Sequence, residues 1–189
     1  MTEKKRLIVG MSGASGAPLT VELLKQLQSR VDVETHLIIT RGGELTLAQE
    51  TGLTPDELAA IADVSYDIDS IGAAPASGSF KTIGMIVIPC SMKTVAGIAS
   101  GYSDNLLLRA ADVTLKERRR LVLAARETPL STLHLRNLHE ASSLGAVIMP
   151  PVPAWYRHPE NMEECVRDMV NRMLCQFDLN TEDYEWGGM

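Results

Sequence analysis

Residues 7–18 read Leu7-Ile8-Val9-Gly10-Met11-Ser12-Gly13-Ala14-Ser15-Gly16-Ala17-Pro18. The segment opens with a short apolar run that is typical of a buried strand. Three glycines then predict a turn, and a proline suits the first turn of a helix. The residues that follow place leucines at helical spacing, at Leu19, Leu23, Leu24 and Leu27. The segment therefore predicts a strand, a glycine-rich turn and a helix in direct succession.

The same alternation continues along the chain. Apolar runs predict further strands at 34–40, 84–88, 121–125 and 146–149, and helical patterns lie at 45–50, 54–62, 104–117, 131–144 and 161–177. Strands that are apolar on both faces indicate a mostly parallel sheet covered by helices on each side, a three-layer α/β fold. We expect one domain over residues 1–177, a C-terminal tail over 178–189, and an irregular loop over 65–82.

The topology predicts where a ligand binds. In open α/β sheets, ligands lie outside the carboxyl ends of the strands. The loops that leave those ends are 10–16, 40–41, 89–94, 126–127 and 150–156. The first lacks the spacing of a dinucleotide fingerprint and of a Walker A loop. Its free N–H groups and two serines favour an anion site at a helix start, and the alternative is a turn needed only for packing.

Charged side chains follow two other strands. Lys93 stands beside hydroxyl residues after one buried strand, and Arg126 follows another, so both suit contact with a phosphate. The run of Lys116, Glu117 and 118–120 closes a helix, and we interpret Arg118, Arg119 and Arg120 as a solvated face. His36 lies inside a strand and faces the core, and the histidine spacing supports no metal site.

Composition excludes several classes of protein. The chain has 189 residues and a net charge of −6, which makes it a poor nonspecific partner for nucleic acid or an acidic membrane. No apolar run reaches the ~18 residues of a membrane span. Three scattered cysteines fit a reducing compartment, and the N-terminus leaves no room for a signal peptide, so we expect a cytoplasmic protein.

Several motifs in one order resemble a known family. They are Gly13-Ala-Ser-Gly16, Ser77-Gly-Ser-Phe-Lys-Thr-Ile-Gly-Met85, Pro89-Cys-Ser-Met-Lys-Thr94, Arg109-Ala-Ala-Asp-Val-Thr-Leu-Lys-Glu-Arg118, Arg126-Glu-Thr-Pro-Leu130 and Met149-Pro-Pro-Val-Pro-Ala-Trp-Tyr156. Together they closely resemble the UbiX-type flavin prenyltransferases, which include the B subunits of phenolic and hydroxyarylic acid decarboxylases. The resemblance covers residues 6 to about 177.

The resemblance implies a flavodoxin-like, Rossmann-like protein that assembles as a homo-oligomer, in this family typically a dodecamer. Such a protein binds reduced FMN and joins a dimethylallyl group from dimethylallyl phosphate to flavin N5 and C6, without a metal. The prenylated FMN is the cofactor of a UbiD-type decarboxylase. The resemblance leaves open whether the donor is a monophosphate or a pyrophosphate.

Site residues follow from the matching motifs. The resemblance assigns FMN contacts to Gly13, Ala14, Ser15, Thr40, Ser91, Met92, Lys93, Thr94 and Arg126, with Thr40 where many members have serine. It assigns the prenyl-phosphate pocket to Lys116, Glu127, Tyr156 and Arg172, with Trp186 near it or in a frayed tail. The catalytic set that it implies is Ser15, Glu50, Lys116 and Glu127.

Two rival functions remain. One is an FMN-dependent decarboxylase of the superfamily that acts on cysteine-derived peptides and phosphopantothenoylcysteine. Those enzymes carry a catalytic histidine and an asparagine motif after the central strand, where this chain has Cys90-Ser-Met-Lys-Thr94 and no suitable histidine. The other is a non-catalytic FMN-binding subunit of a decarboxylase, which would have no use for Glu50, Lys116, Glu127, Tyr156 and Arg172.

Overall fold

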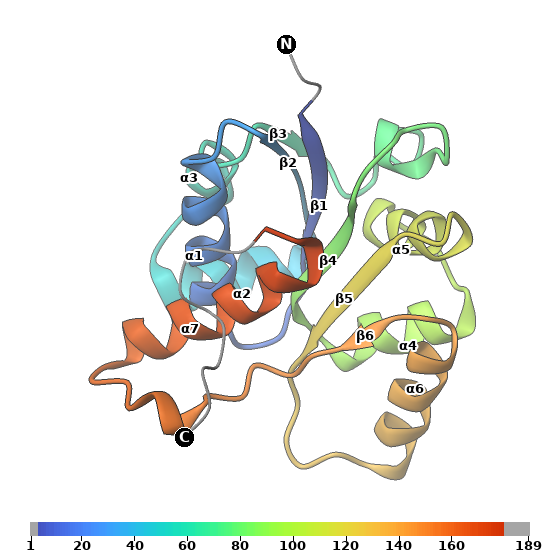
Figure 1. Ribbon diagram of the computed structural model, residues 1–189. Helices are drawn as coiled ribbons and strands as arrows, with labels where there is room; N and C mark the ends of the chain where they lie inside the picture. The colour runs from blue at the N-terminus through green and yellow to red at the C-terminus, as the bar shows by residue number, and fades with distance from the viewer. Residues whose placement is uncertain (1–3, 180–189) are drawn as a thin grey trace.

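A computed structural model describes residues 4–179, which form one six-stranded sheet with helices around it (Figure 1). The strands are β1 (Lys5–Met11), β2 (Val33–Ile39), β3 (Val64–Tyr66), β4 (Gly84–Cys90), β5 (Arg120–Ala125) and β6 (Val147–Ile148). The helices are α1 (Ala17–Gln28), α2 (Arg41–Thr51), α3 (Pro55–Ala59), α4 (Met92–Ser100), α5 (Leu106–Lys116), α6 (Thr132–Ser143) and α7 (Met162–Leu174). Short 3-10 turns are η1 (Ala74–Ala76), η2 (Trp155–Arg157) and η3 (Cys175–Phe177).

The strand order is β3-β2-β1-β4-β5-β6, and each neighbouring pair is parallel. The chain runs outward from β1 in one direction and then from β4 in the other. The order therefore reverses between β1 and β4, which is the place where open α/β sheets bind their ligands. This arrangement confirms the predicted three-layer α/β fold.

Successive residues of each central strand face opposite layers. Leu7 and Val9 of β1 pack under α1, α2, α3 and α7, while Ile8 packs with α4, α5 and α6 on the other face. Figure 1 shows these two groups of helices on opposite sides of the sheet. Burial of both faces explains why the strands are apolar along their whole length. No helix in the described range 4–179 is long and apolar enough to cross a membrane.

Local signals placed most helix starts correctly. Thr54 and Glu57 form the capping box predicted at the start of α3, and Asn161 accepts a hydrogen bond from the N–H of Glu164 at the start of α7. Leu179, which lies in the predicted C-terminal tail, is fully buried in the same core cluster as Val170 and Met173 of α7.

The segment 65–82 is more structured than its sequence predicts. It begins within the edge strand β3 and contains η1. Phe80 packs edge-on against His36, with 5.0 Å between ring centroids, and Arg6 lies 5.0 Å above the same ring. These contacts come from residues distant in sequence, so no local period announces them.

The interpretation of Arg119 as part of a solvated face is wrong. Its guanidinium donates to the carbonyl oxygens of Phe80 and Gly78, each at 2.7 Å. A planar guanidinium can satisfy two carbonyls at once, which a local helix-dipole argument does not consider. Arg119 therefore anchors the segment 78–80 on the end of α5.

His36 is buried, as predicted, and its ring makes two hydrogen bonds. Nε2 lies 2.7 Å from Glu34 Oε1, and Nδ1 lies 2.9 Å from the Tyr66 hydroxyl. Burial lowers the pKa of His36 below its ordinary value, although the Glu34 carboxylate opposes this. The neutral ring satisfies both partners when Nε2–H donates to Glu34 and the tyrosine O–H donates to Nδ1.

We expect the free energy of unfolding to fall as the pH is lowered, because of His36. The unfolded chain protonates His36 near pH ~6.5, and the folded chain does so only at lower pH, so the native state is favoured above this range and loses stability below it. Urea unfolding at pH 7.5 and 5.5 measures the change, and His36→Gln should reduce it. His139→Gln, at an exposed position, should keep it; equal effects of both variants would contradict this origin.

Candidate functional site

A groove of about 440 Å³ lies at the carboxyl ends of the central strands, and we call it the central groove. Its volume lies within the ~300–1,000 Å³ of typical ligand pockets. The loops after β1, β2 and β4 all contribute, and α5 closes the other side. Residues from the predicted set that line it are Gly13, Thr40, Ser91, Lys93 and Thr94.

Ser12 ties two of these loops together. The side chain is 1% exposed, and its hydroxyl donates to the carbonyl of Pro89 at 3.0 Å and accepts from the N–H of Ser91 at 2.7 Å. The backbone N–H of Ser12 also donates to Pro89, at 3.1 Å. The loops after β1 and β4 are therefore held in fixed relation across the switch point.

Two helices begin at the central groove. Thr40 caps α2 by accepting from the N–H of Gly43 at 3.1 Å, and Ser91 caps α4 by accepting from the N–H of Thr94 at 3.3 Å. The first N–H groups of a helix lack partners within it and favour an anion. Lys93 is exposed beside one of these starts. The groove thus offers hydrogen-bond donors and positive charge for a phosphate.

Gly13 and Gly42 pack backbone against backbone at the wall of the groove. A Cβ atom added at Gly13 would lie 2.9 Å from the Cα and carbonyl carbon of Gly42. Contacts this short are not tolerated between a methyl group and backbone, so the loop must carry glycine here to lie against α2.

The anion predicted at the start of α1 comes from the chain itself. Glu50, near the end of α2, accepts from the N–H groups of Gly16 and Ala17 at 2.8 Å each through one oxygen. Partial burial favours the neutral acid, but hydrogen bonds from Ser15, Gly16 and Ala17 and the charge of Arg126 hold the pKa of Glu50 below its usual value. Glu50 is therefore ionised near neutral pH.

A second, smaller cavity of about 180 Å³ holds two more residues of the predicted set, and we call it the α7 cavity. Tyr156 from η2 and Arg172 from α7 both line it, beside Met149, Met169 and Met173. Arg126 and Glu127 are exposed on the loop after β5. Ala14, in the loop after β1, and Met92, the first residue of α4, are buried, and Trp186 lies outside the described residues.

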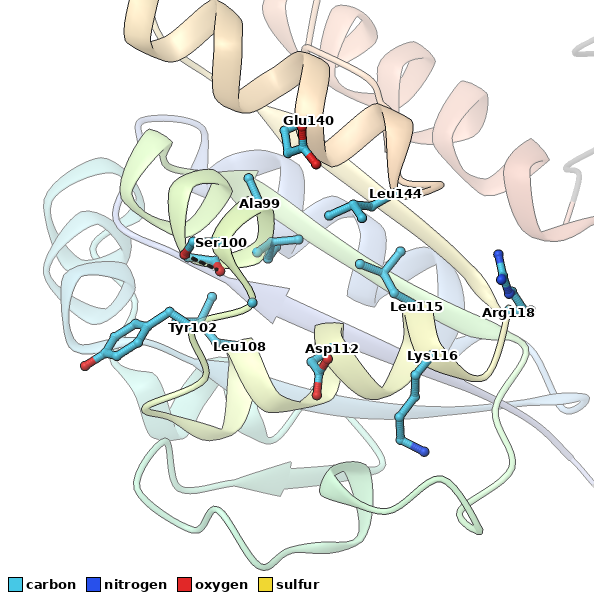
Figure 2. A pocket seen from close by; sticks show the side chains of 13 residues that line it. Ala99, Ser100, Tyr102, Leu108, Asp112, Leu115, Lys116, Arg118, Glu140 and Leu144 are labelled. Carbon is cyan, nitrogen blue, oxygen red and sulfur yellow. Dashed lines mark hydrogen bonds between the residues drawn. The ribbon is translucent and has the colours of Figure 1, made fainter.

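Lys116 lies apart from both cavities. It ends α5, whose other end is at the central groove, and 11 residues at about 1.5 Å each separate the two ends by about 16 Å. There it pairs with Glu117 and lines a third cavity of about 500 Å³ between α4, α5 and α6 (Figure 2). A single chain does not bring Lys116 to the other predicted residues.

Some residues of the central groove were absent from the predicted set. Arg41 follows Thr40 and pairs with Asp69 at 2.9 Å across the rim, and Asn105 caps α5. Arg41 belongs to the loop 40–41, which the topology predicts at the ligand-binding edge, although no ligand contact was assigned to it. Asp69 lies in the aperiodic segment 65–82, which carried no signal for its position.

Comparison with known proteins identifies the family. A family model described as Flavoprotein matches residues 1–172. A flavin prenyltransferase UbiX of Escherichia coli strain K12 is 53% identical over 175 residues, which is 93% of each protein. The chain belongs to the UbiX-type flavin prenyltransferase family. The resemblance inferred from the sequence motifs is thereby confirmed.

Solved structures of UbiX-type proteins agree with this fold. AnUbiX (PadA1), crystallised with FMN and dimethylallyl pyrophosphate, is 50% identical with a TM-score of 0.95, over 99% of this chain and 100% of that one. A dodecameric FMN-dependent UbiX-like decarboxylase from Escherichia coli O157:H7 is 50% identical with a TM-score of 0.94, over 97% and 100%. The cysteine decarboxylase TvaF shares only the fold, at 19% identity over 76% and 88% with a TM-score of 0.62.

The packing of Gly13 predicts the effect of a methyl group in the wall of the groove. Gly13→Ala should lower the free energy of unfolding by about 1–3 kcal/mol, the usual cost of overpacking. Gly72→Ala is the matched control, because a Cβ there meets nothing within 4 Å. Denaturant unfolding measures both, and equal stability of the two variants would show that the loop and α2 separate freely.

Proposed function

We propose that this protein is a flavin prenyltransferase. It joins the dimethylallyl group of dimethylallyl phosphate to N5 and C6 of reduced FMN, and the product serves a UbiD-type decarboxylase. The observation that carries this is the ionised Glu50 carboxylate, fixed by the N–H groups of Gly16 and Ala17 next to Ser15 in the loop after β1. Sequence identity of 50% and 53% to flavin prenyltransferases, over 97% and 93% of this chain, supports it.

FMN suits the central groove. Its phosphate would meet the helix starts at Thr40 and Ser91 and the charge of Lys93, and the apolar side chains of Ile68 and Leu107 offer a surface to a flat ring. Gly13, Ala14, Met92, Thr94 and Arg126 would complete the site. Bound and reduced, FMN supplies the nucleophilic N5 and C6 atoms that form the new carbon bonds.

Ser15 and Glu50 are placed to move one proton. When N5 forms a bond to the prenyl carbon, the proton on N5 must leave. The Ser15 oxygen would take that proton while its own would pass to the Glu50 carboxylate, whose pKa Ser15 helps to lower. The low pKa of Glu50 keeps that carboxylate ready as acceptor at neutral pH.

The prenyl phosphate would use the α7 cavity. Breaking the allylic C–O bond leaves both electrons on phosphate oxygen, and a fixed cation stabilises that charge. Arg172 supplies a guanidinium, Tyr156 a hydroxyl, and the methionines of the cavity shield the allyl carbons from water. Glu127, which follows Arg126 on the loop after β5, would border the same ligand.

An oligomer would complete the site. The family motif assigns Lys116 to the prenyl phosphate, whereas one chain holds it at the far end of α5. The motif assignment and the position of Lys116 in one chain agree if a neighbouring subunit brings its Lys116 to the site. The dodecameric relative from Escherichia coli O157:H7 supports assembly of this kind, and we propose a homododecamer. Three free cysteines suit a reducing, cytoplasmic setting.

Incubation with reduced FMN and dimethylallyl phosphate or pyrophosphate tests the function directly. The mass spectrum of the released flavin should gain one dimethylallyl group, and the better donor identifies the natural phosphate. A flavin-dependent decarboxylase would instead release carbon dioxide from a peptidyl cysteine or an aromatic acid, and a binding subunit would leave the flavin unchanged. Either of those two results contradicts the proposal.

Arg172→Ala should separate the two ligands. A hydrogen bond to a charged group contributes about 1.5–3 kcal/mol, so loss of the guanidinium should weaken use of prenyl phosphate by about ten- to a hundredfold. FMN affinity, measured by fluorescence quenching, should stay within a few-fold. Tyr156→Phe keeps the ring and loses one neutral hydroxyl, so its effect should be milder. Equal loss of both ligands in Arg172→Ala would assign Arg172 to FMN or to folding.

Mixed oligomers should reveal the origin of Lys116. Lys116→Ala and Glu50→Gln are each expected to be poorly active. Subunits of the two variants, dissociated and reassembled together, should regain activity, because some sites then combine an intact groove with an intact Lys116. Glu50→Gln mixed with Arg126→Ala is the control without recovery, since the charge of Arg126 acts on Glu50 in one chain. No recovery in the first mixture would place Lys116 outside a neighbour's site.

A further inference from the structure

Arg157 and Asp168 form an ion pair between η2 and α7. Arg157 Nε lies 2.6 Å from Asp168 Oδ1, and the two side chains are 32% and 17% exposed. The pair joins the turn that carries Tyr156 to the helix that carries Arg172. A pair this close and this sheltered is stronger than an ordinary exposed one.

Asp168 also stands one helical turn before Arg172. Residues four apart on a helix lie on one face, within reach of a carboxylate–guanidinium pair. Both residues line the α7 cavity, and Asp168 additionally lines the neighbouring cavity that contains Arg157. Asp168 therefore stands near two cations, Arg157 and Arg172, and Arg172 belongs to the proposed phosphate site.

The structure shows which cation the carboxylate takes. Asp168 pairs with Arg157, and within residues 4–179 Arg172 has neither an ion pair nor a hydrogen bond. The other carboxylate nearby, Glu164, accepts from the N–H of Glu160 and lies 3.9 Å from Arg167. The guanidinium of Arg172 thus keeps its charge available on the wall of the α7 cavity.

We propose that Arg157 is a positioning residue for the prenyl phosphate: it holds the Asp168 carboxylate away from Arg172, so that Arg172 can bind the phosphate. This inference rests on the proposed function, which places the phosphate in the α7 cavity. Without Arg157, the carboxylate would turn to Arg172 and compete with the incoming anion. The charge shared by the three groups would also fall from +1 to zero.

Binding of dimethylallyl phosphate to protein loaded with oxidised FMN tests this without any chemical step. Calorimetry should show that Arg157→Gln weakens binding about tenfold, the effect of one lost charged hydrogen bond. Asp168→Asn should not weaken binding, because it removes the competitor. The double variant Arg157→Gln/Asp168→Asn should regain most of the affinity lost in Arg157→Gln.

Two results would overturn the proposal. If Asp168→Asn weakens binding as much as Arg157→Gln and the double variant shows no recovery, the ion pair only fastens η2 to α7. If Arg157→Gln leaves binding unchanged, Asp168 does not compete for Arg172. FMN affinity and the thermal midpoint of each variant serve as folding controls. Failure of the wild-type protein to prenylate FMN while these affinities follow the expected order would refute the function and leave the charge relation standing.

Discussion

The site depends on one buried hydroxyl at the point where the sheet changes direction. Ser12 connects the loop after β1 to the loop after β4, and it is a donor and an acceptor at once. Those two strands are neighbours in the sheet, but their loops lead to helices on opposite faces. Without a tie, the two loops would be free to separate, and the central groove lies between them. A hydroxyl is the smallest side chain that can donate to one backbone group and accept from another.

Glu50 of α2 adds a second attachment for the loop after β1. It reaches from the end of α2 to the start of α1, so the glycine turn after β1 is held by Ser12 on one side and by a carboxylate on the other. The same contacts that fix the turn also keep Glu50 ionised. Structural support and acid–base readiness therefore come from one set of hydrogen bonds. This explains how a group on the surface of α2 can have a defined protonation state.

Local patterns predicted the layers of the fold well. The apolar strands, the capping box at Thr54 and the leucine repeat of α1 are determined by neighbours in sequence, and they were found where expected. The motif-based resemblance also named five residues that the fold places in the central groove. What it could not supply was contact between distant segments: the Ser12 bridge, the Phe80 cluster and the grip of Arg119 on residues 78–80. Lys116 shows the same limit: a motif assigns it to the prenyl-phosphate pocket, but the fold of one chain places it at the far end of α5.

The distribution of charge explains how an acidic chain can select small phosphorylated ligands. The whole chain carries −6, which disfavours nonspecific contact with polyanions. Lys93 and Arg172 stand at the central groove and the α7 cavity, and Arg126 acts on Glu50 nearby. Their fields are short in range at physiological ionic strength, about 8 Å, so only an anion that enters a cavity meets them. A carboxylate close to such a cation must then be occupied elsewhere or it would cancel the attraction. Glu50 is occupied by the N–H groups of α1 and Asp168 by Arg157, so in each case a second partner leaves the nearby cation with its charge.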